Sequence, residues 1–349
     1  MTDQRTAHSR WRMGWNYYWP ITVLLAILGV SGQAGAGHED GKVLVLAQPL
    51  ARADAIWMAQ ARGFFKEENL QVTVRWLSSG NDALRAFEDG REGKPGAGDF
   101  VVVNELLAVN FWQTAAADFA VIAALARDAD GYVAVAGKEV ATPQALRGKS
   151  VATQLGSTSA WFLGEYLRAH GMSERDIAVR NVTPDAISSW DPDKGDVAAV
   201  FVREPYGARV LTTQGSRVHR LTTARGYMSG YLVVGTWERY LRDHPGVAER
   251  FLRALDKGRR YAEEHKAEVV QFAREMFSGN EDTSPVEADY ATADRVLGLD
   301  KITLDDFDNL AAWMRAAGLA KRAFDRRSFF NPSPLRGALP ERLSPEFGR

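Results

Sequence analysis

Short β-forming runs alternate with helical stretches along most of this chain, and this alternation constrains the fold more than any other feature. KVLVLA (Lys42–Ala47) and QVTVRWL (Gln71–Leu77) have the composition of strands, and a helix is predicted between them at Asp54–Glu68. A short helix at Asn81–Glu88 then precedes the apolar run Phe100–Val103. Alternating strands and helices favour a parallel sheet covered on both faces, so we predict an α/β fold.

The same alternation returns in a second block of the chain. Thr142 followed by Pro143 is the pattern of a helix start, with a capping residue before proline at the first helical position. Gly171 is a suitable left-handed cap at the end of a longer helix. The predicted elements are strands at Ser150–Thr153, Ile177–Val182 and Val197–Val202, and a helix at Thr158–His170.

Two apolar runs, YVAVA (Tyr132–Ala136) and YLVV (Tyr231–Val234), flank the second block. We interpret them as paired hinge strands, because a chain that leaves one lobe to build another must return. This predicts one lobe from residues 37–130 and 230–349 and a second lobe from residues 131–229. Beyond Thr236 the predicted elements are helices at Pro245–Glu264, Lys266–Met276, Pro285–Val296 and Leu304–Leu319, then a surface tail from Asn331 onward.

The N-terminus has the order of a secretory signal peptide. Basic residues precede the apolar run Ile21–Val30, and the small residues of Ala34-Gly35-Ala36 follow it. This run is shorter than the roughly 20 residues needed to span a bilayer. We therefore predict a signal peptide at residues 1–36, cleaved near Ala36, and a periplasmic protein; an uncleaved N-terminal anchor is the alternative.

Composition excludes several classes of partner and chemistry. The chain has 43 Lys and Arg against 44 Asp and Glu, a formal net charge of -1, so no field of one sign draws it to nucleic acid. Its lack of cysteine excludes disulfides, thiolate metal sites and cysteine nucleophiles. The six histidines are dispersed, and Asp191, Asp193 and Asp196 fit a polar turn better than a calcium loop. We predict no metal and no cofactor.

Neither of two catalytic motifs is present in full. Gly148-Lys149-Ser150 lacks the glycine that a phosphate-binding loop needs at position 143, and it leads into a strand instead of opening a helix. The turn G-S-T-S-A departs from the G-x-S-x-G of a serine hydrolase, and no base can be identified for it. Catalysis is therefore unsupported by any motif.

Three hydroxyl residues, Ser157, Thr158 and Ser159, follow Gly156 at the predicted start of a helix. The first backbone N–H groups of a helix have no intrahelical partners and lie at the positive end of its dipole. These hydroxyls can cap the helix, or they can join the free N–H groups in binding a carboxylate or sulfonate. Both interpretations stay open at this point.

The run LRGKSVATQLGSTSAWFLGEYLRAHGMSERDIAVRNVTPDAISSW, followed by GDVAAVFVREPYGARVL, resembles periplasmic binding proteins for aliphatic sulfonates, taurine and nitrate. ADAIWMAQARGFFKEENLQVTVRWLSSG and GDFVVVNELLAVNF resemble the same family, and the likeness covers roughly residues 42–330. It implies a type II periplasmic-binding-protein fold with two lobes, two hinge strands and a ligand cleft between the lobes. It also implies a monomer that delivers a small organic anion to an inner-membrane ABC permease.

The resemblance assigns ligand contacts to particular positions. The anionic head of the ligand would meet the hydroxyl turn, Ser157–Ser159. Arg203 departs from the family pattern in a way that suits a carboxylate or sulfonate. Glu105 and Glu204 would instead suit an ammonium group, and Trp57, Trp76 and Trp161 would form either an apolar wall or core. The implied ligand-binding residues are Gln48, Ser79, Asn104, Glu105, Gly156, Ser157, Thr158, Ser159, Arg203 and Glu204.

Two other functions compete with the solute receptor. An enzyme like the pyrimidine synthases of thiamin biosynthesis would share the fold, but those proteins rely on a cysteine-rich segment that this chain lacks. A sensory or adaptor protein would use the same ligand-binding lobes to dock on a receptor. A receptor without catalysis is the function that we expect.

Overall fold

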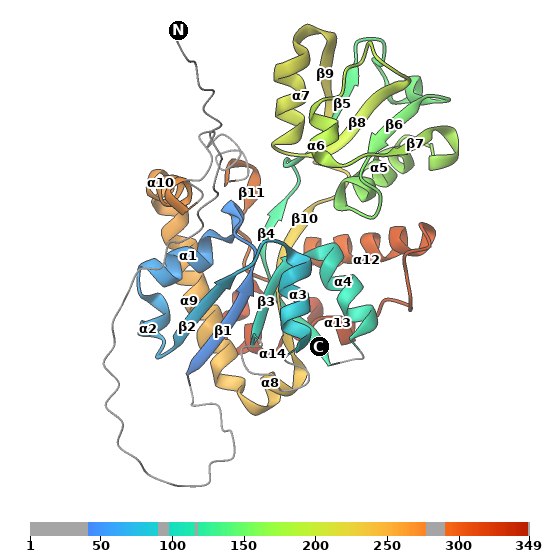
Figure 1. Cartoon of the computed structure of the whole chain (residues 1–349). Helices are drawn as coiled ribbons and strands as arrows, with labels where there is room; N and C mark the ends of the chain where they lie inside the picture. The colour runs from blue at the N-terminus through green and yellow to red at the C-terminus, as the bar shows by residue number, and fades with distance from the viewer. Residues whose placement is uncertain (1–40, 90–97, 116–117, 277–289, 348–349) are drawn as a thin grey trace, which may run out of the picture. The chain divides into compact units, whose positions relative to one another are not determined.

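Two mixed β-sheets with helices packed around them make up the fold (Figure 1). The computed structural model describes residues 41–89, 98–115, 118–276 and 290–347. The predicted signal peptide and its cleavage site lie outside the described residues. No helix in the described ranges is long and apolar enough to cross a membrane.

The first sheet contains six strands in the order β11-β4-β10-β3-β1-β2. β1 lies between β2 and β3 and is parallel to both, whereas β10 is antiparallel to β3 and β4. The strands are β1 (Lys42–Ala47), β2 (Gln71–Trp76), β3 (Phe100–Asn104), β4 (Phe119–Asp128), β10 (Gly230–Trp237) and β11 (Ala293–Asp294).

The second sheet contains five strands in the order β7-β6-β8-β5-β9. β6 is parallel to its neighbours β7 and β8, and β5 is antiparallel to β8 and β9. The strands are β5 (Tyr132–Gly137), β6 (Ser150–Thr153), β7 (Ala178–Asn181), β8 (Val197–Arg203) and β9 (Val218–Thr223).

Both sheets differ from the parallel arrangement that the sequence predicts. β10 enters the first sheet where β3 finishes, with Leu232 opposite Asn104, so it must run against β3. The two predicted hinge strands also do not pair with each other, because Tyr132–Ala136 lies in the second sheet and Tyr231–Val234 in the first. The chain crosses between the sheets at residues 129–131 and 224–229.

Three helix predictions need correction, and several elements were not predicted. The helix at Asp54–Glu68 is broken by Gly63, whose φ of 76° is left-handed, and no side-chain cap from Thr142 precedes the short 3-10 turn at Pro143–Leu146. Within the predicted helix Pro285–Val296, residues 285–289 lie outside the described ranges and Ala293–Asp294 form a strand. The elements that were missed are strands β4 and β9 and helices α4 (Glu105–Thr114), α7 (Tyr206–Gln214) and α8 (Glu238–Asp243).

Helices cover both faces of each sheet. Against the first sheet, α3 contacts β1 and β3, and Phe251 of α9 stacks on Phe100 of β3 with ring centroids 4.4 Å apart. Against the second sheet, α5 contacts β6 and β8, and α7 contacts β5 and β8. The helices are α1 (Asp54–Ala61), α2 (Phe64–Glu67), α3 (Gly80–Glu88), α4 (Glu105–Thr114), α5 (Thr158–Ala169), α6 (Pro184–Ser188), α7 (Tyr206–Gln214), α8 (Glu238–Asp243), α9 (Pro245–Glu264), α10 (Lys266–Met276), α12 (Lys301–Ala316), α13 (Arg326–Phe329) and α14 (Ser333–Ala338).

The two-residue period of β8 explains how the second sheet is buried on both faces. Ala199 and Phe201 belong to the large core cluster, whereas Val200 and Val202 belong to a separate cluster on the other face. Phe201 packs against Phe162 of α5. A strand that is apolar at every position is therefore required here, as the sequence VAAVFV provides.

Candidate functional site

A cavity of about 260 Å³ is lined by residues of both sheets. Most of them follow the carboxyl ends of parallel strands: Gln48 follows β1, Asn104 ends β3, and Ser157 lies in the turn after β6. In open α/β sheets this is the edge where ligands bind. The full lining is Gln48, Leu50, Arg52, Gly80, Asn81, Val102, Val103, Asn104, Leu106, Leu107, Tyr132, Gln154, Gly156, Ser157, Thr158, Ser159, Pro184, Arg203 and Leu232.

Seven of the ten predicted ligand-binding residues line this cavity, and three do not. Ser79 caps α3: its hydroxyl accepts from Asp82 N at 3.1 Å and donates to the Asp82 carboxylate at 2.7 Å. Glu204 accepts from Ala208 N at 2.8 Å and pairs with Arg220 at 3.4 Å. Glu105 is fully buried beside the cavity and bonds to neighbouring protein groups.

The three residues of the hydroxyl turn differ in their roles: some bond within the protein, and one offers its hydroxyl to the cavity. Ser157 donates to Gln154 O at 2.7 Å and accepts weakly from Ala160 N at 3.4 Å, so it caps α5. Thr158 donates to Glu105 Oε1 at 2.6 Å. Ser159 is buried, and no hydrogen bond joins its hydroxyl to another residue in the described ranges. The Ser159 hydroxyl can therefore donate a hydrogen bond to a ligand in the cavity.

Two arginines supply the positive charge of the cavity. Arg203 ends β8, and no ion pair joins it to another described residue. Arg52 lies in the 3-10 turn Ala51–Ala53 before α1; it is 5% exposed, and its Nη1 lies 3.4 Å from Asp128 Oδ2. Nothing acidic is among the described residues that line the cavity. An anion is thus the charge that this cavity accommodates best.

Sequence reasoning missed Arg52, Asn81, Tyr132 and Gln154 as cavity residues. Arg52 stands between Ala51 and Ala53 in an apolar segment that directly follows a strand, which is the signal that could have found it. Tyr132 was placed in a hinge strand, yet it is buried at the cavity wall, and this burial raises its pKa to about 12. It remains a neutral hydroxyl at physiological pH.

The three tryptophans proposed as a cavity wall lie elsewhere. Trp57 and Trp161 are buried in the core, and Trp76 packs at its border against Trp57 with ring centroids 6.2 Å apart. Of the two roles that the sequence allows them, core packing is the one they have. Leucine and valine side chains form the apolar part of the cavity wall instead.

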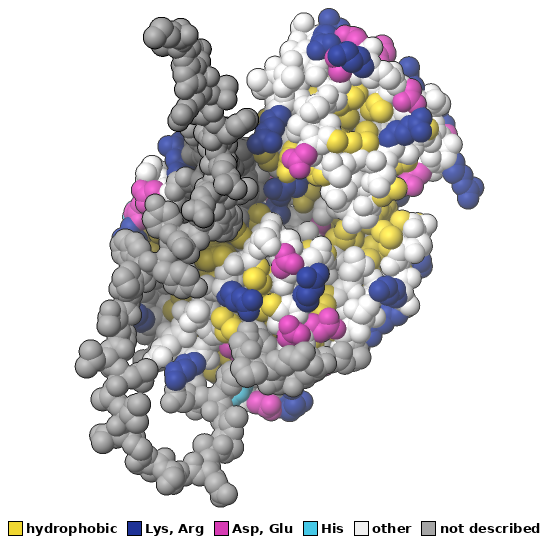
Figure 2. Space-filling model, in the orientation of Figure 1, with side chains coloured by type: hydrophobic (Ala, Val, Ile, Leu, Met, Phe, Trp, Pro, Cys, Tyr) yellow, Lys and Arg dark blue, Asp and Glu magenta, His cyan; other side chains and the backbone are white. Residues whose placement is uncertain are grey.

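Across the described residues, no cluster of three or more His, Asp or Glu side chains is arranged to hold a metal ion. Among the described side chains on the face drawn in Figure 2, Lys and Arg are interspersed with Asp and Glu, so these side chains form no field of one sign there. The cavity is therefore distinguished by its own arginines and hydroxyls rather than by the charge of the surface around it.

A model of the family described as NMT1/THI5 like matches residues 53–269. The chain belongs to the NMT1/THI5-like family. The match begins directly after Arg52 and extends into α10, so in this NMT1/THI5-like chain it includes the hydroxyl turn and Arg203. No curated protein sequence matches the chain.

Solved structures resemble this NMT1/THI5-like chain in fold. The periplasmic aliphatic sulphonate binding protein SsuA from Escherichia coli is 14% identical with a TM-score of 0.69, over 84% of this chain and 92% of that chain. The alkanesulfonate-binding protein SsuA from Xanthomonas axonopodis pv. citri, bound to MOPS, is 18% identical with a TM-score of 0.60, over 82% and 96%. A cysteine-to-serine mutant of DSZB, in complex with biphenyl-2-sulfinic acid, is 13% identical with a TM-score of 0.61, over 87% and 100%. The two-lobed fold of the periplasmic binding proteins is thus confirmed.

Proposed function

We propose that this protein is the solute-binding component of an ABC importer and that it binds a small organic anion without catalysis. The observation that carries the proposal is the cavity between the two sheets, where Arg52, Arg203 and Ser159 converge and no described lining residue is acidic. Charge-assisted hydrogen bonds from arginine are the strong contacts that a sulfonate or carboxylate requires.

Within this proposal, the tail of the ligand is apolar or neutral rather than cationic. Glu105 and Glu204, the two groups that would suit an ammonium, already accept hydrogen bonds from protein groups and lie outside the cavity lining. Leu50, Leu107 and Leu232 offer apolar contact instead. This favours an alkanesulfonate over its amino-substituted counterpart taurine.

The remaining features of a receptor belong to the same proposal. We infer export to the periplasm after removal of residues 1–36, delivery to an inner-membrane permease, and action as a monomer. We also assign residues 37–130 and 230–349 to one lobe and residues 131–229 to the other. The membership of β5–β9 in one sheet and of β1–β4, β10 and β11 in the other supports this division.

The likeness to DSZB raises an enzyme as the competing function. The cysteine replaced in that mutant has no counterpart here, because the chain contains no cysteine. A nucleophile–base pair is also not evident among the described cavity residues, which include no histidine, aspartate or glutamate. A receptor that binds and releases its ligand unchanged needs neither group.

The test is calorimetric titration and thermal denaturation with ethanesulfonate, propionate and taurine. Ethanesulfonate at one hundred times its dissociation constant adds about 2.7 kcal/mol to the free energy of unfolding, which raises the melting temperature by a few degrees. Arg203→Gln should weaken binding about 10-fold to 150-fold, because one charge-assisted contact is lost. Arg209→Gln, an exposed position on α7, is the control and should bind normally. No binding, or equal binding by both variants, would contradict the proposal.

A further inference from the structure

Glu105 is a buried carboxylate that joins three segments of the chain beside the cavity. It begins α4, directly after β3, and its side chain is fully buried. Its Oε1 accepts from the Thr158 hydroxyl of α5 at 2.6 Å, and its Oε2 accepts from Tyr231 N of β10 at 2.7 Å. The carboxylate therefore connects the first sheet, the helix that carries the hydroxyl turn, and the strand by which the chain returns.

A carboxylate in this position is costly unless all its bonds are made. Burial raises the pKa of Glu105, and the hydrogen bonds from Thr158 and Tyr231 act in the opposite direction. Well-packed apolar groups often replace buried charges without loss of stability, so packing alone does not account for a glutamate here. The two bonds have a geometric effect instead: they fix the start of α5 relative to β10.

A second contact holds the same helix against the first lobe. Gly164 of α5 faces Trp313 of α12, and a Cβ at Gly164 would lie 2.7 Å from the indole nitrogen. α5 is thus supported by α12 at its middle and by Glu105 at its start. Thr158 lies between Ser157 and Ser159 on the cavity wall, so any shift of Thr158 moves its neighbours.

We propose that Glu105 is a positioning residue for ligand binding, which holds the first turn of α5 against the first lobe so that Ser159 and the exposed backbone N–H groups face the ligand. This inference rests on the proposed function. Glu105 itself does not contact the ligand. It acts through Thr158 and through the way the two lobes pack against each other.

The test is a double-mutant cycle on Glu105→Ala and Thr158→Val, read by ethanesulfonate affinity. Each variant should weaken binding by about tenfold or more, and the double variant should be no weaker than the poorer single one, because both remove the same bond. Glu105→Gln should restore most of the affinity, since its amide can accept from Tyr231 N and donate to the Thr158 hydroxyl. If the two losses multiply, or if Glu105→Ala binds normally, the inference is wrong.

Matched controls come from the same region. Among the described residues, the buried Thr153 hydroxyl has no hydrogen-bond partner, and the buried Glu165 carboxylate pairs only with Arg168 on its own helix; Thr153→Val and Glu165→Ala remove these groups. Neither should alter affinity. Urea unfolding of each variant without ligand confirms that it folds.

The same cycle separates this inference from the proposed function. If the native protein binds none of the anions, the proposed function fails, and the unfolding free energies of the ligand-free variants still measure the coupling between Glu105 and Thr158. Non-additive losses would show that the bond joins the lobes, whereas additive losses would overturn that part of the inference. Binding by the native protein with normal affinity in Glu105→Ala would overturn the inference and leave the proposed function intact.

Discussion

The packing of α9 on α1 makes Gly258→Ala a sharp test of the structure. A Cβ at Gly258 would lie 2.2 Å from the carbonyl oxygen of Ala55 and 2.9 Å from Ala59 N. Carbon–oxygen contacts between backbones are normally about 3.3 Å or longer, so the two helices would have to separate by roughly 1 Å. Because both contacting atoms belong to the backbone, no change of rotamer can relieve the clash.

The magnitude follows from two opposing effects. Overpacking a well-packed interface costs about 1–3 kcal/mol, and the backbone clash places this case near the upper end. Alanine in place of glycine in a helix recovers up to about 1 kcal/mol. Gly246→Ala, exposed on the same helix with open space around its Cβ position, has only the favourable effect. We therefore expect the two variants to differ in unfolding free energy by about 3 kcal/mol.

Urea denaturation followed by circular dichroism measures both variants, with equal m-values as the sign that the same transition is observed. Since Arg52 lies in the 3-10 turn that leads into α1, displacement of that helix should also weaken anion binding in Gly258→Ala. Equal stability of Gly258→Ala and Gly246→Ala would refute the close approach of the two helices and the reasoning built on it.

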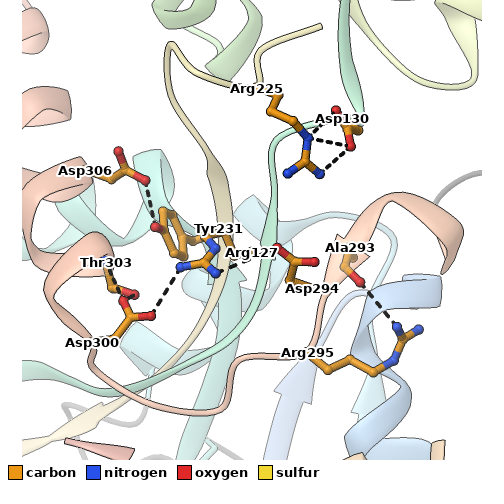
Figure 3. A network of polar contacts seen from close by, with 10 residues as sticks. All are labelled: Arg127, Asp130, Arg225, Tyr231, Ala293, Asp294, Arg295, Asp300, Thr303 and Asp306. Atoms are coloured by element: carbon orange, nitrogen blue, oxygen red, sulfur yellow. Dashed lines mark hydrogen bonds and ion pairs between the residues drawn. The ribbon is translucent and has the colours of Figure 1, made fainter. Parts of the chain in front are cut away.

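Three further predictions concern hydrogen bonds near the cavity and the connections. Ser157→Ala should lower the unfolding free energy by about 0.5–2 kcal/mol through loss of the α5 cap, measured by urea denaturation. Asp130→Asn should cost about 0.2–1 kcal/mol at neutral pH, because the hydrogen bond from Arg225 lowers the pKa of Asp130 and both groups are partly exposed. The difference in unfolding free energy between the native protein and Asp130→Asn should be fully present above about pH 4, the pKa of Asp130 in the unfolded chain. It should vanish as the pH falls through the lowered pKa of Asp130 in the folded protein, and a difference that does not change with pH would contradict this. Tyr231→Phe should cost about 1–3 kcal/mol in thermal denaturation, because the 2.7 Å bond to the partly buried Asp306 is lost (Figure 3).

Strand ends explain how much of the cavity the sequence predicts. Gln48, Asn104 and Arg203 each lie where an apolar run stops, and parallel strands bring such positions to one edge. The hydroxyl turn was found by the same rule. Arg52 was missed because a 3-10 turn has no hydrophobic period that would show which way its side chains face.

A strand end followed by a helix is also where prediction becomes ambiguous. Ser79 and Glu105 stand at such positions, but the Ser79 hydroxyl is used by its helix cap and the carboxylate oxygens of Glu105 by neighbouring segments. A capping group and a ligand-binding group require the same residue types at the same place, so sequence cannot distinguish them. Their roles as ligand contacts stay predictions, as does that of Glu204.

The antiparallel direction of β5 and β10, and the strand β4, were not predicted for a different reason. β4 and β5 are apolar on both faces and are separated only by residues 129–131, so the pattern gives no sign that the chain changes sheet there. The direction of β10 depends on where the second sheet returns the chain, which is a property of the whole topology.

The two connections between the sheets, residues 129–131 and 224–229, are tied to each other by the ion pair of Asp130 with Arg225 (Figure 3). Two separate tethers would let one lobe slide, twist or tilt against the other. Two tethers fastened at one point behave as a single pivot, which leaves rotation about that point as the easiest motion. We therefore expect the ends of the lobes far from Asp130 to travel widely while the distance between the two connections stays nearly constant.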